Sequence, residues 1–235
     1  MMQKRTSTFI AIFVTATCVV VMCYLGFWQL DRMTQKQQRL ASITQKQGND
    51  SFDLLHALSL DDPSDVSVTF QGVADNQHVF LLDNQIHQSR IGFDVVVPML
   101  TNAGWLLVNY GWIQAPDKVR TLPAITIDNV ASHFEGIISI PQNNPMITET
   151  LSSAPQFPAL IQQVSIARIK QVLDLDLLPY VVQLTGDSAT FVRAYTPVVM
   201  PPEKHLGYAV QWFALALAAA VIGGIAIIKK GRSYE

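Results

Sequence analysis

The residues best suited to chemistry lie at the start of an apolar stretch near the C-terminus. At 100° per residue, His205 falls within about 40° of one line along a helix with four others, namely Ala209, Trp212, Ala216 and Gly223. A neutral imidazole at His205 can bind iron axially, and the rings of Tyr208 and Trp212 can pack on a porphyrin. This end of the stretch therefore predicts a candidate porphyrin site.

Cations on the first helix complete this candidate site. Two antiparallel spans place Gln29 and Arg32 at the same membrane depth as His205 and Lys204, and Lys36 lies one turn beyond Arg32. Lys or Arg at this depth can pair with propionates through charge-assisted hydrogen bonds. The alternative is that these aromatic and basic residues only mark the lipid headgroup region, where Trp, Tyr, Lys and His are common at the ends of spans.

Two long uncharged stretches account for the low charge of the whole chain. Only 14% of the 235 residues are charged, against roughly 25% in an ordinary soluble domain. The stretches are Thr8–Phe27 and Leu206–Ile228, and each can cross a hydrocarbon layer about 30 Å thick. A two-span membrane protein is predicted, and a soluble cytoplasmic enzyme is excluded. The formal net charge of −2 gives no basic face for nucleic acid, so the lipid bilayer and not nucleic acid is the expected partner.

Basic residues beside the two spans predict the orientation. Lys4 and Arg5 precede the first span, and Lys229, Lys230 and Arg232 follow the second, so both termini are expected to face the cytoplasm. The first span ends in bulky residues and not in a small-residue cleavage site, which indicates a retained anchor. No Arg- and Ser-rich presequence precedes it, which favours a bacterial inner membrane and a periplasmic central domain.

The expected fold class is a membrane protein with two transmembrane helices bracketing an extracytoplasmic α+β domain with a mainly antiparallel sheet. The expected divisions are a cytoplasmic tail at 1–7, a transmembrane helix at 8–27, the extracytoplasmic domain at 28–205, a second transmembrane helix at 206–228 and a cytoplasmic tail at 229–235.

Periodicity within the domain predicts short helices and many strands. Helical spacing continues the first span over 28–40 and recurs at Ser51–Leu60 and Gln163–Leu173, whereas four prolines indicate a loop over 141–160. Turn residues at Asp83-Asn84 and Asn102-Ala103-Gly104 indicate hairpins. Alternation predicts strands at Val66–Val73, Val79–Leu82, Gly92–Leu100, Trp105–Ile113, Val130–Ile140, Tyr180–Leu184 and Phe191–Tyr195.

Catalytic motifs are absent from the sequence. It contains no nucleophile elbow, zinc-protease helix, Walker A loop or dinucleotide-binding glycine pattern. Cys18 and Cys23 both lie in the first span, about 140° apart on a helix, and cannot bridge within one chain. His78 and His87 flank a predicted hairpin, across which they could face each other. A membrane-tethered hydrolase using them with two nearby carboxylates, Asp83 and Asp94, remains the least favoured alternative.

Three blocks of the chain resemble the surfeit locus protein 1 family. The pattern Gly-x-Trp-Gln-x-x-Arg-x-x-x-Lys occurs from Gly26 to Lys36. A strand block "vnRGW" occurs as Val108-Asn109-Tyr110-Gly111-Trp112, with tyrosine in place of the usual arginine. The signature "nnHlgYAlqWf" occurs from His205 to Phe213. The blocks stand in order and extend over nearly the whole chain.

The resemblance implies a non-catalytic assembly factor for haem-copper cytochrome c oxidase. It implies haem a as the cofactor, bound at His205, and help in delivering haem a to the catalytic subunit. The implied partners are cytochrome c oxidase subunits, especially the haem-bearing subunit, and the haem a synthase. The alternative within this role is a membrane scaffold that holds oxidase subunits together without binding haem.

Overall fold

The computed structural model describes residues 2–48, 51–116, 121–195 and 200–232 of the chain. The chain divides into two compact units. One is formed by both ends, Met1–Ser42 and Val198–Glu235, and the other by Ile43–Pro197. Of the basic side chains on which the expected orientation depends, that of Lys229 is described, whereas those of Lys4, Arg5, Lys230 and Arg232 lie outside the described residues, as do positions 1 and 233–235 of the tails. The orientation and the expected divisions therefore stay predictions.

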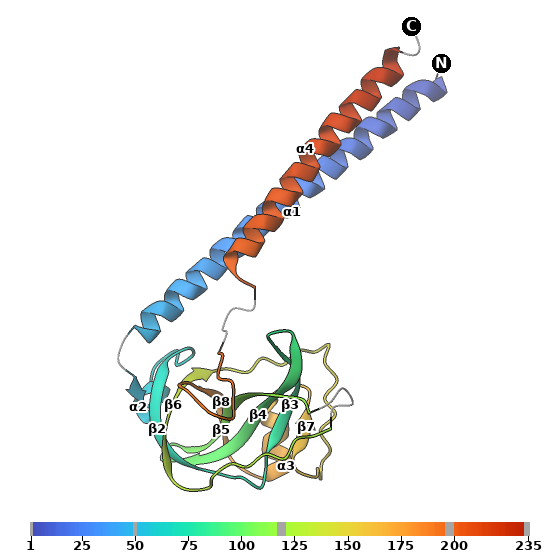
Figure 1. Cartoon of the computed structure of the whole chain (residues 1–235). Coiled ribbons are helices and arrows are strands. Elements are labelled where there is room, and N and C mark those ends of the chain that lie inside the picture. Colours follow the sequence, from blue (N-terminus) through green and yellow to red (C-terminus); the bar gives the residue numbers. More distant parts are fainter. Residues whose placement is uncertain (1, 49–50, 117–120, 196–199, 233–235) are drawn as a thin grey trace. The chain divides into compact units, whose positions relative to one another are not determined.

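The unit formed by the chain ends is a pair of long helices. α1 runs over Met2–Gln47 and α4 over Pro202–Arg232, and the two lie antiparallel, side by side (Figure 1). Each contains a stretch long and apolar enough to cross a membrane, and almost no side chain of these stretches is buried. Large apolar residues such as Phe13, Phe27 and Leu217 are exposed. An apolar outer surface is typical of helices in lipid, so the pair supports a two-span membrane protein.

α1 continues well past its apolar stretch. It extends from Phe27 to Gln47 as one helix, beyond the expected end at residue 40. Polar side chains line this part, and the amide of Gln35 donates to Asp31 at 2.7 Å. Within the apolar part, Cys18 is exposed and Cys23 half-buried, and both are free thiols.

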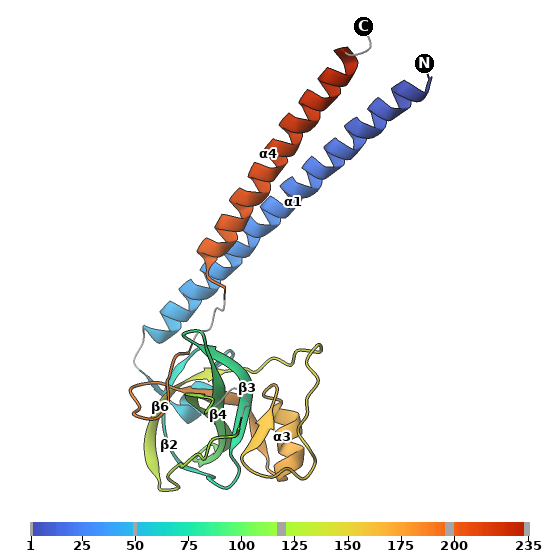
Figure 2. The same ribbon diagram turned by 45° about the vertical axis from the view of Figure 1, so that its right-hand side comes forward.

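The unit formed by Ile43–Pro197 is built around a closed ring of five strands. Its eight strands are hydrogen-bonded in the order β1-β2-β6-β8-β5-β4-β3-β7, and β2 also pairs with β4. Strands β2, β6, β8, β5 and β4 therefore close on themselves (Figures 1 and 2). The strand bounds are β1 Phe52–Asp53, β2 Ser67–Ala74, β3 Phe80–His87, β4 Arg90–Thr101, β5 Gly104–Gln114, β6 Ser132–Ser139, β7 Ala159–Ile161 and β8 Leu177–Leu184.

Among the described residues the sheet is mainly antiparallel, as predicted, but it is mixed, because three of its eight strand pairs are parallel. The pairs β1–β2, β3–β7 and β5–β8 are parallel, and the other pairs are antiparallel. β8 joins β5 only after a connection that contains β6, β7 and α3 (Ile166–Leu173), because parallel strands need a long crossover. Alternation in the sequence predicts which face of a strand is buried. It carries no information on which neighbour the strand pairs with, and the parallel pairs were missed for that reason.

The hairpin between β3 and β4 turns later than predicted. Asp83 and Asn84 lie inside β3, at a register shift between Leu82 and Gln85. The turn instead uses Gln88 and Ser89, with φ of 46° and 63°. Positive φ at both central positions usually selects Asn-Gly or Asp-Gly, so Gln-Ser gave no turn signal. The predicted turn at Asn102 and Ala103 is confirmed by the pairing that closes the β4–β5 hairpin.

Other boundaries differ by a few residues. The first short helix of the domain is α2, Leu54–Leu58, and its Asp53 cap accepts from the Leu55 amide at 3.0 Å. The predicted strand at Phe191–Tyr195 forms only an isolated bridge, between Val192 and Trp112. The predicted loop over 141–160 ends in β7, whose short parallel pairing has no alternation to reveal it.

Two apolar clusters hold the domain together. Val68, Phe93 and Leu106 belong to the larger one, which lies among the ring strands and α2. The smaller one joins Phe80 and Ile169, so α3 is fixed against the outside of the ring.

Candidate functional site

The two long helices meet along small residues. A Cβ atom on Gly26 of α1 would lie 2.7 Å from the ring of Phe213 on α4, and one on Gly223 would lie 2.4 Å from Thr15. Phe213 also makes an edge contact with Phe27, with ring centroids 5.2 Å apart. Glycine is needed at both positions, because a larger residue would keep the helices from approaching so closely.

His205 faces α1 in this contact. Its side chain is buried, with 8% of the residue exposed, and Ala209 and Ala216 on the same stripe are buried as well. The Nδ1 atom of His205 lies 2.8 Å from Oε1 of Gln29. A carbonyl oxygen can only accept, so Nδ1 carries the proton and donates to Gln29. The hydrogen bond fixes both the orientation and the tautomer of the ring.

The other ring nitrogen of His205 is left with a free lone pair. Nε2 is buried and has no hydrogen-bond partner. In this tautomer it can accept a hydrogen bond or ligate a metal, and metal-bound histidines commonly donate their second N–H to an oxygen, as His205 does to Gln29. The donor chemistry therefore fits axial ligation of a haem iron. Because Nε2 is shielded, a ligand can reach it only if the α1–α4 contact opens locally.

The other predicted site residues surround His205 at different levels. Trp212 is half-buried on the same face of α4, seven residues or about 10 Å toward the middle of the helix pair, and Tyr208 is 44% exposed between them. On α1, Lys36 is half-buried seven residues beyond Gln29, about 10 Å in the opposite direction. The aromatic rings thus lie on one side of the His205 level and the cations on the other.

Arg32 is exposed on α1 and already has local partners. Its guanidinium lies 5.4 Å from the centre of the Trp28 ring and donates to Gln35 at 3.0 Å. Both contacts are exposed and within one helix, so they are weak enough for Arg32 to exchange them for an anionic group.

Small residues recur every four positions on α4, at 216, 220 and 224, but they are only partly in the contact. Ala216 is buried, but Ala220 is exposed and a Cβ on Gly224 would meet nothing within 4 Å. The close approach uses Gly223 instead, one residue earlier, because that residue lies on the His205 line.

Gln29 is the site residue that sequence analysis left without a role. It stood at the predicted depth of His205, but depth alone does not say which face of α1 it occupies. Gly26 and Gln29 are three residues apart and therefore share a face. A glycine needed for close helix contact would have pointed to Gln29 as the residue beside His205.

The block Val108–Trp112 forms a bulge in β5. Val95 and Val96 of β4 pair with Gly111 and Asn109, which leaves Tyr110 as the extra residue. The side chain of Tyr110 is buried and its hydroxyl has no hydrogen-bond partner, and burial raises its pKa to about 12. Gly111 has φ of 119°, and a Cβ there would lie 2.7 Å from the carbonyl oxygen of Val192.

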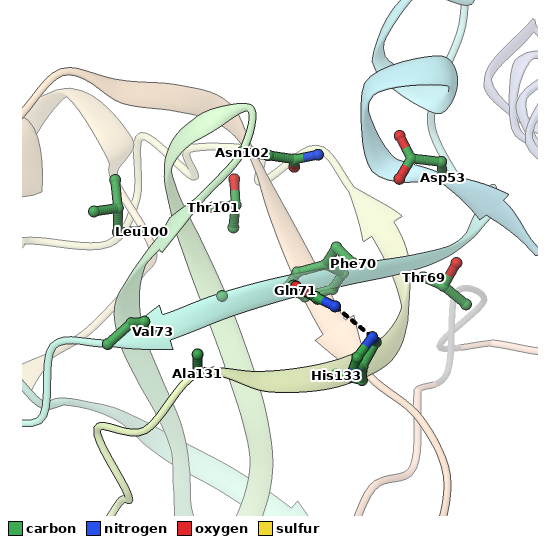
Figure 3. Close-up of a pocket in the computed structure, with 11 residues that line it drawn as sticks. Asp53, Thr69, Phe70, Gln71, Val73, Leu100, Thr101, Asn102, Ala131 and His133 are labelled. Atoms are coloured by element: carbon green, nitrogen blue, oxygen red, sulfur yellow. Dashed lines mark hydrogen bonds between the residues drawn. The ribbon is translucent and has the colours of Figure 1, made fainter.

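A surface hollow of about 510 Å³ lies where β2 passes from β6 to β4 (Figure 3). Gln71 and His133 point toward each other across the strand pair and are hydrogen-bonded. Thr101 already bonds the backbone at Gly104 and Ala103, and Asp53 caps α2. The polar groups that line the hollow thus serve local structure. Among these lining residues no nucleophile and base are brought together.

The residues considered for hydrolysis do not converge. His78 precedes β3 and contacts Asp75 at 2.6 Å, whereas His87 ends β3 and lies against Trp112, with ring centroids 5.3 Å apart. The two histidines lie at opposite ends of one strand and not across a hairpin from each other, so the expectation that they face each other is wrong. The carboxylates have separate partners too. Asp83 accepts from the Asn84 amide and Asp94 from the Asn109 side chain.

Comparisons with known proteins match most of the chain. A model of the SURF1 family matches residues 16–217 of the chain, which include α1 from mid-span, the whole domain and about half of α4. A SURF1-like protein from Rickettsia bellii (strain RML369-C) is 22% identical over 214 residues, covering 86% of this chain and 85% of the relative.

Proposed function

This chain belongs to the SURF1 family, and on that premise we propose that it is a membrane-anchored, non-catalytic assembly factor for haem-copper cytochrome c oxidase. In this role it binds haem a and assists its delivery to the haem-bearing catalytic subunit. The proposed site is the α1–α4 contact around His205, in a bacterial inner membrane with both termini cytoplasmic and the domain periplasmic.

The observation that carries the proposal is the state of the His205 ring. Nδ1 donates to Gln29 at 2.8 Å, and Nε2 is buried with its lone pair unused. A buried polar atom without a partner is unfavourable by about 1–3 kcal/mol. A ring held in this way favours a ligand at Nε2, and iron ligation would remove the unsatisfied group.

The other residues orient the bound group. If bound here, haem would supply an iron atom, and the His205 imidazole would hold it through Nε2. Trp212 and Tyr208 offer ring faces on the span side of His205, and Arg32 and Lys36 offer cations on the side toward the domain. Arg32 and Lys36 would therefore hold the propionates on the side away from the membrane centre, and Trp212 and Tyr208 would hold the apolar ring on the span side.

Transfer of the haem requires that binding be reversible. The shielded Nε2 makes opening of the α1–α4 contact part of both loading and release. The haem a synthase and the oxidase subunit are the proposed donor and acceptor, and each would engage the helix pair from the lipid side, where apolar side chains are exposed.

A scaffold that holds oxidase subunits without haem is the second candidate. The close contacts of Gly26 and Gly223 favour it, because they give the helix pair a fixed shape without any ligand. For a scaffold, loss of the His205 imidazole is silent, whereas enlarging Gly26 is damaging. For a haem carrier, both changes are damaging.

The test is the visible absorption spectrum of the purified full-length protein, co-expressed with haem a synthesis. The wild type is expected to carry haem a, and His205→Ala is expected to lose it or to shift its bands while remaining folded. His56→Ala is the matched control, because His56 is an exposed histidine of α2 in the domain. Haem-free wild type, or an unchanged spectrum in His205→Ala, would leave the scaffold as the better account.

A further inference from the structure

Both chain connections to the helix pair are fastened to one short segment of the domain. The Lys46 ammonium, near the end of α1, donates to the Asp62 carboxylate at 2.7 Å and to the Ser64 carbonyl at 2.9 Å. At the other end of the domain sequence, the Tyr195 hydroxyl donates to the buried Asp65 carboxylate at 2.9 Å. Residues 62–65 therefore mark the region from which both connections leave.

The same region adjoins the turn of the β3–β4 hairpin. Val192, three residues before Tyr195, exchanges two backbone hydrogen bonds of 2.8 Å with Trp112. The Trp112 indole donates to the Gln85 carbonyl at 3.1 Å and its ring lies against His87. The outgoing chain thus passes beside the base of residues Ile86–Ile91, which we call the β3–β4 tip.

The β3–β4 tip has the composition of a membrane-contacting loop. Ile86 and Ile91 are paired across the hairpin and are 71% and 49% exposed. Arg90 is exposed beside them and donates to the Gln114 side chain at 3.2 Å. The tip contains no acidic residue. Exposed aliphatic side chains, a nearby tryptophan and a cation are the groups that favour an anionic lipid surface.

Chain length allows the tip to reach the bilayer. Pro202, where α4 begins, is ten residues after Val192, which limits that distance to about 35 Å even for a fully extended chain. We propose that the β3–β4 tip contacts the headgroup region of the bilayer that α1 and α4 span, with Ile86 and Ile91 inserted and Arg90 at the anionic surface. The proposal rests on the two helices crossing a membrane, and it is independent of haem binding.

The opposite end of β4 supplies a matched control. Asn102 lies in the two-residue turn between β4 and β5 and is exposed, as Ser89 is in the tip. β4 has 12 residues, so the two turns are separated by about 35 Å along one strand. If the tip touches lipid, Asn102 is held far from it.

The experiment measures lipid contact at both turns in the full-length protein. Ser89→Cys and Asn102→Cys are each made with Cys18→Ser and Cys23→Ser, labelled with an environment-sensitive fluorophore and reconstituted in nanodiscs containing anionic lipid. Doxyl-labelled lipid is then added as quencher. Native Cys18, labelled in Cys23→Ser, reports whether α1 is in the bilayer, because Cys18 is exposed on its apolar part.

The expected result is a blue-shifted emission and loss of intensity at Ser89→Cys, with neither at Asn102→Cys. Adding Ile86→Ser and Ile91→Ser should abolish the quenching. Both positions are exposed, so circular dichroism should show an unchanged fold. Absence of quenching at Ser89→Cys, or equal quenching at both turns, overturns the proposal. An unquenched Cys18 label overturns the membrane premise itself, which separates that failure from a failure of the tip.

Discussion

The hydrogen bond from His205 to Gln29 should control how tightly haem a is held. Gln29→Leu keeps a side chain of similar size but removes the only acceptor that the described residues provide for Nδ1 of His205. The ring then loses the group that fixes its tautomer, and Nδ1–H remains buried and unsatisfied. Loss of such a partner typically weakens metal binding 10–100-fold, or about 1.4–2.7 kcal/mol.

Gln29→Glu should act in the opposite direction. A carboxylate accepts more strongly than an amide, so it makes Nε2 a more basic ligand and favours ferric over ferrous iron. We expect haem affinity to be kept and the midpoint potential to fall. The two variants at one position therefore separate an effect on the ring from a general disturbance of the helix pair.

Haem titration of the detergent-purified protein, followed by visible absorption and by redox potentiometry, measures both quantities. Gln38→Leu is the matched control, since Gln38 is an exposed glutamine on the same helix. Equal haem affinity in wild type and Gln29→Leu, together with an unchanged potential in Gln29→Glu, would refute the argument that Gln29 positions His205.

Three further predictions concern stability. Gly26→Val should lower the thermal unfolding temperature of the purified protein, because its side chain would overlap an aromatic ring of α4, whereas Gly224→Ala should be silent. Gly111→Ala should be more destabilising than Gly104→Ala in urea unfolding. Both glycines have positive φ, where an alanine is strained by about 1–3 kcal/mol, but only the Cβ at Gly111 would also meet a backbone oxygen. Tyr110→Phe should stabilise the protein by about 1 kcal/mol in the same assay, because it removes a buried hydroxyl without a partner. Since the folded pKa of Tyr110 is about 12 and its ordinary value is 10.0, the wild type should lose stability from pH 10 toward 12 as the unfolded tyrosine ionises first, and Tyr110→Phe should lack that contribution.

Sequence patterns predicted the elements better than their partners. The two apolar helices follow from the length of Thr8–Phe27 and Leu206–Ile228, and most strands follow from alternation. Parallel pairing of β5 with β8 has no local signal, because it depends on a crossover that the intervening residues complete. The register shift at Asp83 was equally hidden, since Asp-Asn is a common turn pair and only the buried Asp83 side chain shows that the strand continues.

The sequence predicted which residues form the candidate site and at which depth they lie, but not the hydrogen bond between His205 and Gln29 at its centre. His205 and Trp212 share the helix line that their spacing predicts, and the resemblance supplied the haem a hypothesis. The hydrogen bond to Gln29 was missed because antiparallel pairing of the two helices fixes only the depth of each residue in the membrane. Which residues of α1 face α4 depends on the rotation of α1 about its axis, and the position of Gly26 sets that rotation. The prediction that His78 and His87 face each other was wrong for a related reason, because β3 continues for several residues beyond the expected turn.

Ring closure through β2 and β4 also affects how neighbouring copies behave in a crowded membrane. Tethered domains meet one another often, and exposed strand edges invite intermolecular sheet growth. Within the described residues, closure leaves edges at β1, which has 2 residues, at β7, which has 3, and at the part of β3 beyond β7. That part of β3 is interrupted at Asn84, and bulges twist an edge away from a flat partner. The domain can therefore be present at high surface density without polymerising edge to edge.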